Sequence, residues 1–193
     1  MIVYLVRHGQ DDSTVRGGWS SSPLTCEGAL QARRLAEEIG RRREELHIRR
    51  ILSSDLPRAM QTAQPAADVL SLTIEPCPLF REVNNGQLAG MKNDLALARY
   101  PGLFWNTLGW EEPYPGGESP AGFAARISKA WSALTAELSN SPGNILLCTH
   151  SGVIHVIRTL ILGVPYSNRE KHPAVPHAVL IPAGYADGTW RLL

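Results

Sequence analysis

The sequence has 193 residues, a length that suits one domain with a sizeable buried core. Its 19 basic and 18 acidic residues leave a net charge of +1, too little for a broad positive field toward nucleic acid or an anionic membrane. Cys26, Cys77 and Cys148 form no CxxC motif, and the N-terminus lacks the basic and apolar regions of a secretion signal. These features predict a cytoplasmic protein that binds neither nucleic acid nor membrane, and they leave the oligomeric state open.

Residues 1–6 form a short apolar run with β-branched side chains. Such a run predicts a buried strand, because it is far too short to cross a bilayer. Arg7, His8 and Gly9 follow directly. At the carboxyl edge of a parallel sheet they would place an anion binder, a potential nucleophile and a permissive turn together. A strand-end histidine is also often only a hydrogen-bonded structural residue, so the tripeptide alone leaves both interpretations open.

The next segment, residues 10–23, is polar and rich in Gly and Ser, which predicts a loop. Thr25 is suited to cap a helix, and apolar residues then recur at helical spacing over residues 29–39. We expect this helix to pack one face on the sheet. The charged run over residues 41–45 is interpreted as solvated surface at the helix end.

A second informative stretch covers residues 51–63. A short strand is predicted to end in Ser54 or Asp55 as a helix cap, and Pro57 suits a first helical turn because its missing N–H has no intrahelical partner there. Arg58 then lies in that first turn, where the helix dipole disfavours a cation unless an anion is bound nearby. An Arg58 side chain that reaches solvent or pairs with Asp55 is an equally good interpretation at this point.

Glu82 lies at the start of a loop, where a lone surface carboxylate is the simplest interpretation. Residues 84–118 are then predicted to form a small cap-like excursion over one edge of the sheet, with a short helix over residues 94–99. Its aromatic residues could form an apolar wall for a ligand or only anchor the excursion to the sheet. These residues are Phe104, Trp105, Trp110 and Tyr114. The apolar stripe over residues 123–138 predicts a core helix.

The third informative stretch, residues 144–154, repeats the logic of the first. A buried strand ends at His150 and is followed by a turn and an apolar helix that reaches Leu162. The tail is predicted to form two strands at a sheet edge, over residues 178–182 and 189–192, with a connection over the six residues between them. No repeat or linker divides the chain, so residues 1–193 are predicted to form a single α/β domain.

Arg7, His8, Arg58 and His150 all fall at predicted strand ends or in a first helical turn. Parallel strands bring such positions to one edge of a sheet, where two guanidiniums and two imidazoles could surround one dianion. The ordered motifs of the chain are LVRHG at 5–9, PLT at 23–25 with Gly28, Gln31 and Ala32, SSDLPRAMQTA at 53–63, GGES at 116–119 and THSG at 149–152. On these motifs the chain resembles the histidine phosphatase superfamily, the phosphoglycerate-mutase-like proteins, over nearly its whole length.

The resemblance implies a three-layer α/β/α sandwich with a mostly parallel central sheet. It also implies hydrolysis of a small phosphorylated molecule without metal or cofactor, through a phosphohistidine on His8 and with Glu82 as proton donor. The catalytic residues would be His8, Glu82, Arg7, Arg58 and His150. The substrate-binding residues would be Arg7, Thr14, Arg58, His150 and Ser151. These residue types suit the reaction, since neutral imidazole is a usable nucleophile and fixed arginine forks stabilise the equatorial oxygens.

Some positions depart from the family pattern. Asp11 and Thr14 stand where many relatives carry Ser or Thr and then Asn, and Ser21 stands where Asp is frequent. Asp11 and Asp12 would repel a phosphate if they pointed inward, so we expect them to face solvent or a basic neighbour. Thr14 can still donate one hydrogen bond. The residues around Glu82 follow the family's glutamate segment only loosely, which leaves Glu118 as an alternative proton donor.

Several other functions remain open. A phosphomutase would need extra cations to hold a bisphosphate, whereas residues 90–118 contain only Lys92 and Arg99 as basic residues, so phosphatase activity is favoured. A phosphohistidine or protein phosphatase and a non-catalytic phosphate-binding module are further alternatives. A metal hydrolase could use His150, His155 and the pair Asp11 and Asp12. The two histidines, however, are five positions apart and do not match the one-face spacing of a helical zinc site.

Overall fold

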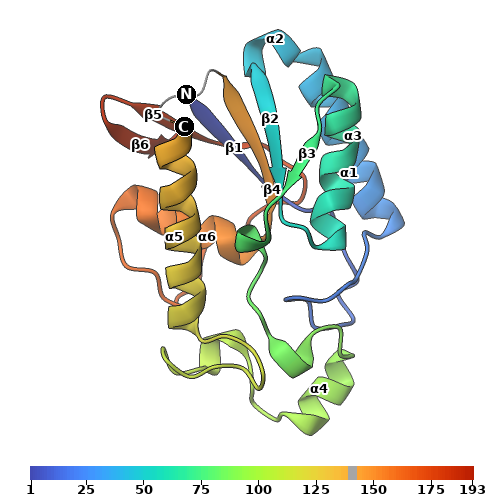
Figure 1. Cartoon of the computed structure of the whole chain (residues 1–193). Coiled ribbons are helices and arrows are strands. Elements are labelled where there is room, and N and C mark those ends of the chain that lie inside the picture. Colours follow the sequence, from blue (N-terminus) through green and yellow to red (C-terminus); the bar gives the residue numbers. More distant parts are fainter. Residues whose placement is uncertain (139–142) are drawn as a thin grey trace.

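A six-stranded sheet forms the centre of the computed structural model, which describes residues 1–138 and 143–193 (Figure 1). Its strands are β1 (Ile2–Arg7), β2 (Ile48–Ser53), β3 (Ile74–Pro76), β4 (Asn144–Thr149), β5 (Ile181–Ala186) and β6 (Thr189–Leu192). They lie in the order β3-β2-β4-β1-β5-β6. The first four are parallel to one another, while β5 is antiparallel to β1 and β6, at the edge, is antiparallel to β5. The sheet is therefore mostly parallel, as the sequence predicted.

Helices cover both faces of this sheet (Figure 1). They are α1 (Cys26–Arg41), α2 (Arg43–Leu46), α3 (Pro57–Leu70), α4 (Asn93–Arg99), α5 (Pro120–Leu138) and α6 (Ser151–Leu162). Helices α1 and α3 pack together on one face, and α5 and α6 lie on the other. The predicted α/β/α sandwich is confirmed.

The two cores follow from the alternation of side chains along the central strands. On β1, Val3 and Leu5 point into the core beneath α5 and α6, whereas Tyr4 and Val6 point into the core beneath α1 and α3. All four are nearly inaccessible to solvent. A strand buried on both faces reads as a continuous apolar run, which is why residues 1–6 show no polar alternation.

The structure has the N-cap that the sequence predicts for α1 but not the one that it predicts for α3. Thr25 caps α1 as predicted, and its Oγ1 accepts a hydrogen bond of 3.1 Å from the Gly28 N–H. The prediction of Ser54 or Asp55 as the cap of α3 is wrong, because Leu56 occupies the N-cap position and makes no side-chain cap. Pro57 and Arg58 lie in the first turn as predicted.

The predicted boundaries of the first tail strand are also wrong. Strand β5 begins at Ile181 and not at residue 178, and it includes residues 183–186, for which the sequence predicts a connection between two strands. Asp187 and Gly188, both with positive φ, make the turn to β6 instead. A glycine such as Gly184 is typical of a loop, but pairing with β1 keeps this residue in the sheet.

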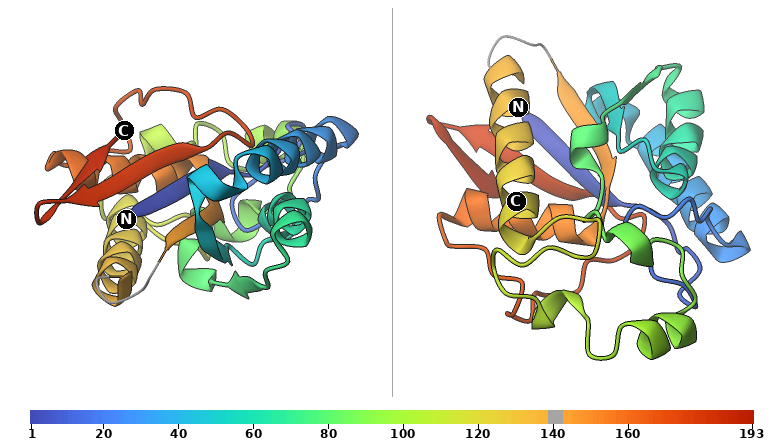
Figure 2. Two further views of the ribbon diagram at one scale, coloured as in Figure 1. Left: turned by 90° about the horizontal axis from the view of Figure 1, so that it is seen from above. Right: turned by 60° about the horizontal axis from the view of Figure 1, so that its bottom comes forward.

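Residues 84–118 cross the carboxyl ends of the parallel strands, as the view with the bottom turned forward shows (Figure 2). They contain α4 and two short 3₁₀ turns, Gly86–Leu88 and Trp105–Thr107. A small core of Leu88, Leu108 and Tyr114 stabilises the segment from within. The helix predicted over residues 94–99 is confirmed as α4.

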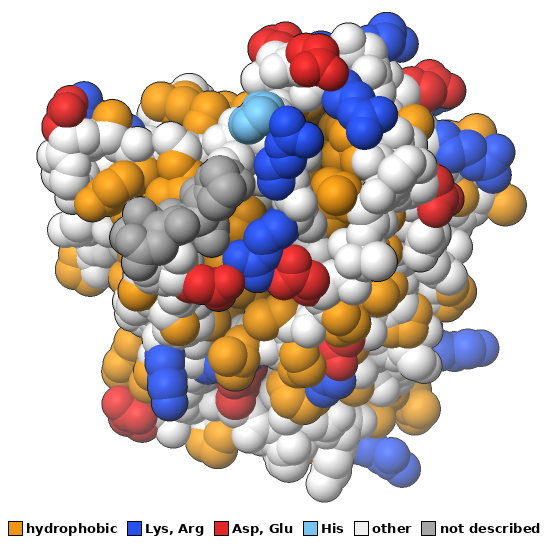
Figure 3. All heavy atoms as spheres, turned by 45° about the horizontal axis from the view of Figure 1, so that its top comes forward, with side chains coloured by type: hydrophobic (Ala, Val, Ile, Leu, Met, Phe, Trp, Pro, Cys, Tyr) orange, Lys and Arg blue, Asp and Glu red, His pale blue; other side chains and the backbone are white. Residues whose placement is uncertain are grey.

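Charged side chains of both signs are interspersed on the opposite end of the molecule (Figure 3). Arg42 pairs with Glu38 and Glu45, and Arg50 pairs with Glu75 and Glu137. This face therefore carries no patch of a single sign. Over residues 1–138 and 143–193, no helix is long and apolar enough to span a membrane.

Candidate active site

The ends of β1 and β4 bring two histidines together. The strands are paired in register up to Arg7 and Thr149, so the next residues, His8 and His150, are neighbours. Their ring centroids lie 5.1 Å apart, and the residues are only 5% and 0% exposed. Two imidazoles thus lie at the sheet edge where open α/β folds bind ligands, as the sequence predicted.

His8 is held in one tautomer. Its Nδ1 lies 2.7 Å from the Gly9 carbonyl oxygen, which can only accept, so Nδ1 carries the proton and Nε2 keeps its lone pair. Burial, reinforced by the positive charge of Arg58, holds the pKa of His8 well below its usual value. His8 is therefore a neutral imidazole near pH 7 with one nitrogen available as a nucleophile.

Arg58 lies directly against this nitrogen. Its Nε donates to His8 Nε2 at 3.2 Å, and its Nη2 donates to the Gly18 carbonyl oxygen at 2.7 Å. The side chain is almost completely buried, and this burial lowers the pKa of Arg58. The negative charges of Asp11 and Glu82 offset only part of that shift. Its place in the first turn of α3 thus points the guanidinium into the site and not toward solvent.

Arg7 and His150 complete the predicted anion site. Arg7 is anchored by a 2.8 Å hydrogen bond from Nη1 to the Val175 carbonyl oxygen, and His150 Nε2 lies 2.8 Å from Ser54 Oγ. Within the described residues, the buried Arg7 Nε and His150 Nδ1 have no hydrogen-bond partner. Because buried polar atoms are usually paired, two unpaired nitrogens in one site are suited to bind a ligand.

Glu82 lies beside the beginning of α6. Its Oε2 accepts a hydrogen bond of 3.0 Å from the Gly152 N–H, and its Oε1 accepts one of 3.1 Å from the Val83 N–H. A Cβ atom on Gly152 would lie 2.4 Å from Oε1, so only glycine allows this approach. The carboxylate thus contacts the backbone of Gly152, two residues after His150, at the positive end of the α6 dipole.

Arg126 and Glu118 hold the backbone that carries Glu82. Arg126 on α5 donates from Nη1 to the Arg81 carbonyl oxygen at 3.0 Å and from Nη2 to the Glu82 carbonyl oxygen at 3.1 Å. Glu118 binds Arg126 Nη2 at 2.6 Å and accepts from the Asn84 N–H at 2.7 Å. Glu118, the alternative proton donor, is therefore committed to this ion pair.

Asp11, Asp12 and Thr14 occupy the rim. Asp12 is exposed and accepts hydrogen bonds from both the N–H and the hydroxyl of Thr14, which is itself exposed. The Thr14 hydroxyl proton is thus used within the loop. Asp11 faces a basic neighbour as expected, but that neighbour is Arg58, with Oδ2 3.5 Å from Nε. A carboxylate therefore lies beside the arginine that was predicted to bind phosphate.

His177 is a residue of the site that sequence reasoning missed. Its Nδ1 donates to the His8 carbonyl oxygen at 2.7 Å, and its ring centroid lies 5.7 Å from that of His8. It reaches the site because residue 177 pairs with Arg7 beside the end of β1. The flanking Pro176 and the absence of a strand pattern hid this placement from the sequence.

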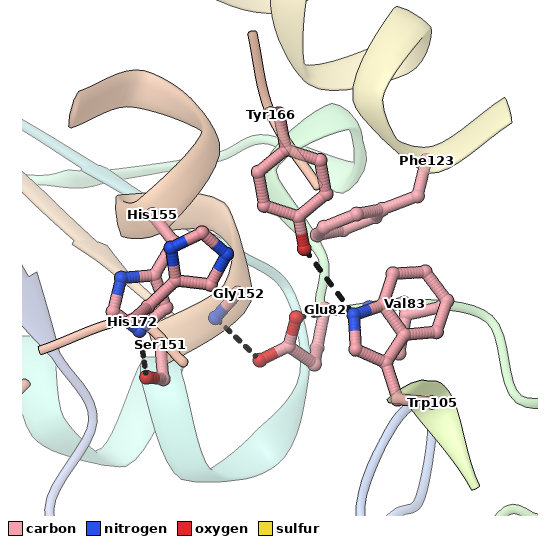
Figure 4. Close-up of a pocket in the computed structure, with 9 residues that line it drawn as sticks. All are labelled: Glu82, Val83, Trp105, Phe123, Ser151, Gly152, His155, Tyr166 and His172. Atoms are coloured by element: carbon pink, nitrogen blue, oxygen red, sulfur yellow. Dashed lines mark hydrogen bonds between the residues drawn. The ribbon is translucent and has the colours of Figure 1, made fainter. Parts of the chain in front are cut away.

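A cavity of about 310 Å³ opens beside Glu82 (Figure 4). Ser151 and Gly152 from α6 form one part of its lining, and Ser151 Oγ lies 3.3 Å from His155 Nε2. Of the four aromatic residues proposed as a wall, Trp105 lines the cavity. Tyr114 stacks behind Trp105, whereas Phe104 lies under Arg16 and Trp110 lines a separate surface groove.

The rival metal site is not assembled. Within residues 1–138 and 143–193, no three His, Cys, Asp or Glu side chains are grouped so that they could hold a metal ion. His150 is fully buried against Ser54, and Asp11 lies against Arg58. The residues suggested for a metal hydrolase thus take part in other contacts.

Comparisons with known proteins show the family of this chain. The family model of the histidine phosphatase superfamily (branch 1) matches residues 3–193. A protein of Erwinia tasmaniensis named probable phosphoglycerate mutase GpmB is 30% identical over 97% of this chain and 86% of its own. The structure of mycobacterial glucosyl-3-phosphoglycerate phosphatase is 28% identical, with a TM-score of 0.77 over 99% of this chain and 96% of that one. The alpha-ribazole phosphatase of Shigella flexneri, 22% identical, shares the fold with a TM-score of 0.85 over 100% of this chain and 95% of its own. The chain belongs to branch 1 of the histidine phosphatase superfamily.

Proposed function

We propose that this protein is a metal-independent phosphomonoesterase that works through a phosphohistidine on His8. The observation that carries the proposal is the environment of His8 Nε2. The Nδ1 hydrogen bond to Gly9 leaves Nε2 unprotonated, and Arg58 Nε donates to this nitrogen at 3.2 Å. A nucleophile and a positively charged fork at the same point suit in-line transfer of a phosphoryl group.

In the first step, His8 Nε2 attacks the phosphorus and the bond to the alcohol oxygen breaks. Arg7, Arg58 and His150 bind the phosphoryl oxygens, and their fixed positions supply charge stabilisation without reorganisation. Glu82, protonated for this step, gives its proton to the departing alkoxide. The products are the alcohol, phosphohistidine and the Glu82 carboxylate.

In the second step, a water molecule attacks the phosphohistidine and the N–P bond breaks. The Glu82 carboxylate accepts a proton from that water, so it returns to the acid form while phosphate leaves His8 neutral. One residue acts as acid and then as base, which closes the cycle without a metal or an organic cofactor.

A phosphoglycerate-type mutase is the second candidate, because the Erwinia relative carries that name. A mutase must hold a second anionic group of its substrate. The two basic residues of the excursion, Lys92 and Arg99, are exposed, and the cavity beside Glu82 has no arginine or lysine in its described lining. The charge distribution therefore favours phosphatase activity.

Rapid quench during turnover of a phosphomonoester labelled at phosphorus tests the proposal. We expect base-stable, acid-labile label on the wild type, none on His8→Ala, and turnover that survives EDTA. Label on a serine, or activity retained by His8→Ala, would contradict the assignment. Supplying 3-phosphoglycerate with its bisphosphate primer tests the second candidate: isomerisation much faster than phosphate release would identify a mutase.

A further inference from the structure

The cavity beside Glu82 has flat, apolar walls. The rings of Tyr166 and His172 are stacked with centroids 5.3 Å apart and planes within 3°, and His172 stacks on His155 at 4.7 Å and 22°. Trp105 and Phe123 stand on another side of the cavity and meet edge to face at 5.6 Å (Figure 4). Five rings from four segments of the chain thus enclose a space of about 310 Å³.

These walls are held in place by their own polar atoms. Trp105 Nε1 donates to the Tyr166 hydroxyl oxygen at 3.2 Å, and His172 Nε2 donates to the Ser167 carbonyl oxygen at 2.8 Å. These contacts fix the orientation of Trp105, Tyr166 and His172 around the cavity. Preformed, mostly aromatic walls with a few polar atoms are typical of small-molecule sites.

The described lining of the cavity lacks the basic side chains that bind an anionic group. Glu82 is the only acidic side chain in the described lining, and no arginine or lysine joins it. Burial lowers the pKa of His155 to about 4, so this imidazole is neutral at pH 7. The nearby Arg16 instead lies over the Phe104 ring at 4.9 Å, and Phe104 is outside the cavity lining.

We propose that the substrates are phosphomonoesters whose alcohol part is uncharged and presents a flat ring to this cavity. The inference rests on the proposed function, because Glu82 must face the ester oxygen for the cavity to receive the alcohol part. A carboxylate or second phosphate there would meet no arginine or lysine of the described lining and would lie against the negative faces of the aromatic rings. A flat uncharged ring would instead bury apolar surface against Trp105 and Tyr166.

Binding of matched phosphonates tests this independently of turnover. Benzylphosphonates that carry a 4-carboxamide or a 4-carboxylate have nearly the same size and differ in charge, and they cannot be hydrolysed. We expect the carboxamide to bind the wild type at least about tenfold more tightly by calorimetry, whereas ethylphosphonate, which lacks the ring, should bind about tenfold more weakly than benzylphosphonate. Equal or tighter binding of the carboxylate would overturn the inference.

Two substitutions identify the cavity as the cause. Trp105→Leu should weaken benzylphosphonate binding several-fold and leave ethylphosphonate binding unchanged, while Trp190→Leu, on β6 and away from the cavity, should change neither. His155→Arg should bring the carboxylate to within about twofold of the carboxamide, because it adds a cation to the lining. The placement of the alcohol part in this cavity would be contradicted if Trp105→Leu kept the full preference for benzylphosphonate over ethylphosphonate and His155→Arg kept the full preference for the carboxamide over the carboxylate. Failure to hydrolyse any ester would instead refute the proposed function, and the phosphonate affinities would still decide between charged and uncharged ligands.

Discussion

Arg58 Nε lies 3.2 Å from His8 Nε2, so the arginine points one of its donors at the nitrogen that we propose as the nucleophile. The other end of the same guanidinium binds the Gly18 carbonyl oxygen, and Nη1 reaches the Ser20 backbone and hydroxyl oxygens at 3.3 Å. The loop over residues 17–20 therefore sets the orientation of the fork. A phosphoryl group transferred to His8 would enter between this nitrogen and this fork.

Arg58→Lys should lower kcat/KM for a phosphomonoester by about 100-fold, because lysine keeps the charge but cannot present the planar set of donors. Steady-state kinetics with 4-nitrophenyl phosphate would measure the loss. Arg50→Lys is the matched control, since Arg50 pairs with Glu75 and Glu137 and lies outside the site. Near-normal turnover of Arg58→Lys would mean that the fork does not bind the transferring group.

The strand-end residues of the site could be predicted from the sequence, whereas its walls could not. His8, Arg58 and His150 each follow or adjoin a buried apolar strand, and a parallel sheet brings all such ends to one edge whatever the details of packing. His172 and Tyr166 lie in a tail segment without periodicity. Only long-range packing against α6 and Trp105 reveals that they line a cavity.

Local signals also failed where tertiary contacts outweighed them. Asp55 is a good helix cap by residue type, but its carboxylate binds Arg81 Nε at 2.6 Å instead. Residues 183–186 have the composition of a loop, yet pairing of residues 183 and 184 with β1 and of all four residues with β6 makes them a strand. Propensity is a weak guide at such positions, because hydrogen bonds from distant segments decide the conformation.

The stability of the fold should fall as pH decreases from 7 to 5. Burial lowers the pKa values of His8, His150 and His155 in the folded protein. In the unfolded chain these histidines have pKa values of about 6.5. Between pH 7 and pH 5 the unfolded chain therefore binds more protons than the folded one, and acidification favours unfolding. Carboxylates such as Asp55, whose pKa is lowered by Arg81, contribute mainly at lower pH, since their unfolded pKa values are about 4. Urea unfolding at pH 7 and pH 5 would measure the difference.

His155→Gln should lose less stability between these two pH values than the wild type, because it removes one of the titrating groups. His47→Gln, at an exposed position, is the control and should follow the wild type. A wild-type unfolding free energy that rises on acidification would show that the histidines do not keep depressed pKa values in solution.

Asp11→Asn should strengthen the binding of inorganic phosphate and orthovanadate by about five- to tenfold. The Asp11 carboxylate lies 3.5 Å from Arg58 Nε, so an anion bound to this guanidinium would lie beside a second negative charge. A unit-charge repulsion at about 4 Å costs about 1 kcal/mol even in water. Inhibition constants at low ionic strength would measure the change. Asp12→Asn, in which the exposed neighbour is altered, should leave them unchanged. Weaker phosphate binding in Asp11→Asn would show that Asp11 organises Arg58 more than it repels the ligand.

Glu82→Gln should impair hydrolysis of alkyl phosphates much more than that of 4-nitrophenyl phosphate. An alkoxide needs a proton as it departs, whereas nitrophenolate is stable without one, so the loss of an acid is felt mainly with the poor leaving group. Glutamine keeps the side-chain oxygen that can accept from the Gly152 N–H, so the local structure should persist. The ratio of kcat/KM values for the two esters, measured in both proteins, should change by at least about tenfold. Glu111→Gln, at an exposed position of the excursion, should leave the ratio unchanged. An equal loss on both esters would instead mean that Glu82 supports the site without giving up a proton, and the search for the acid would then move to Asp11.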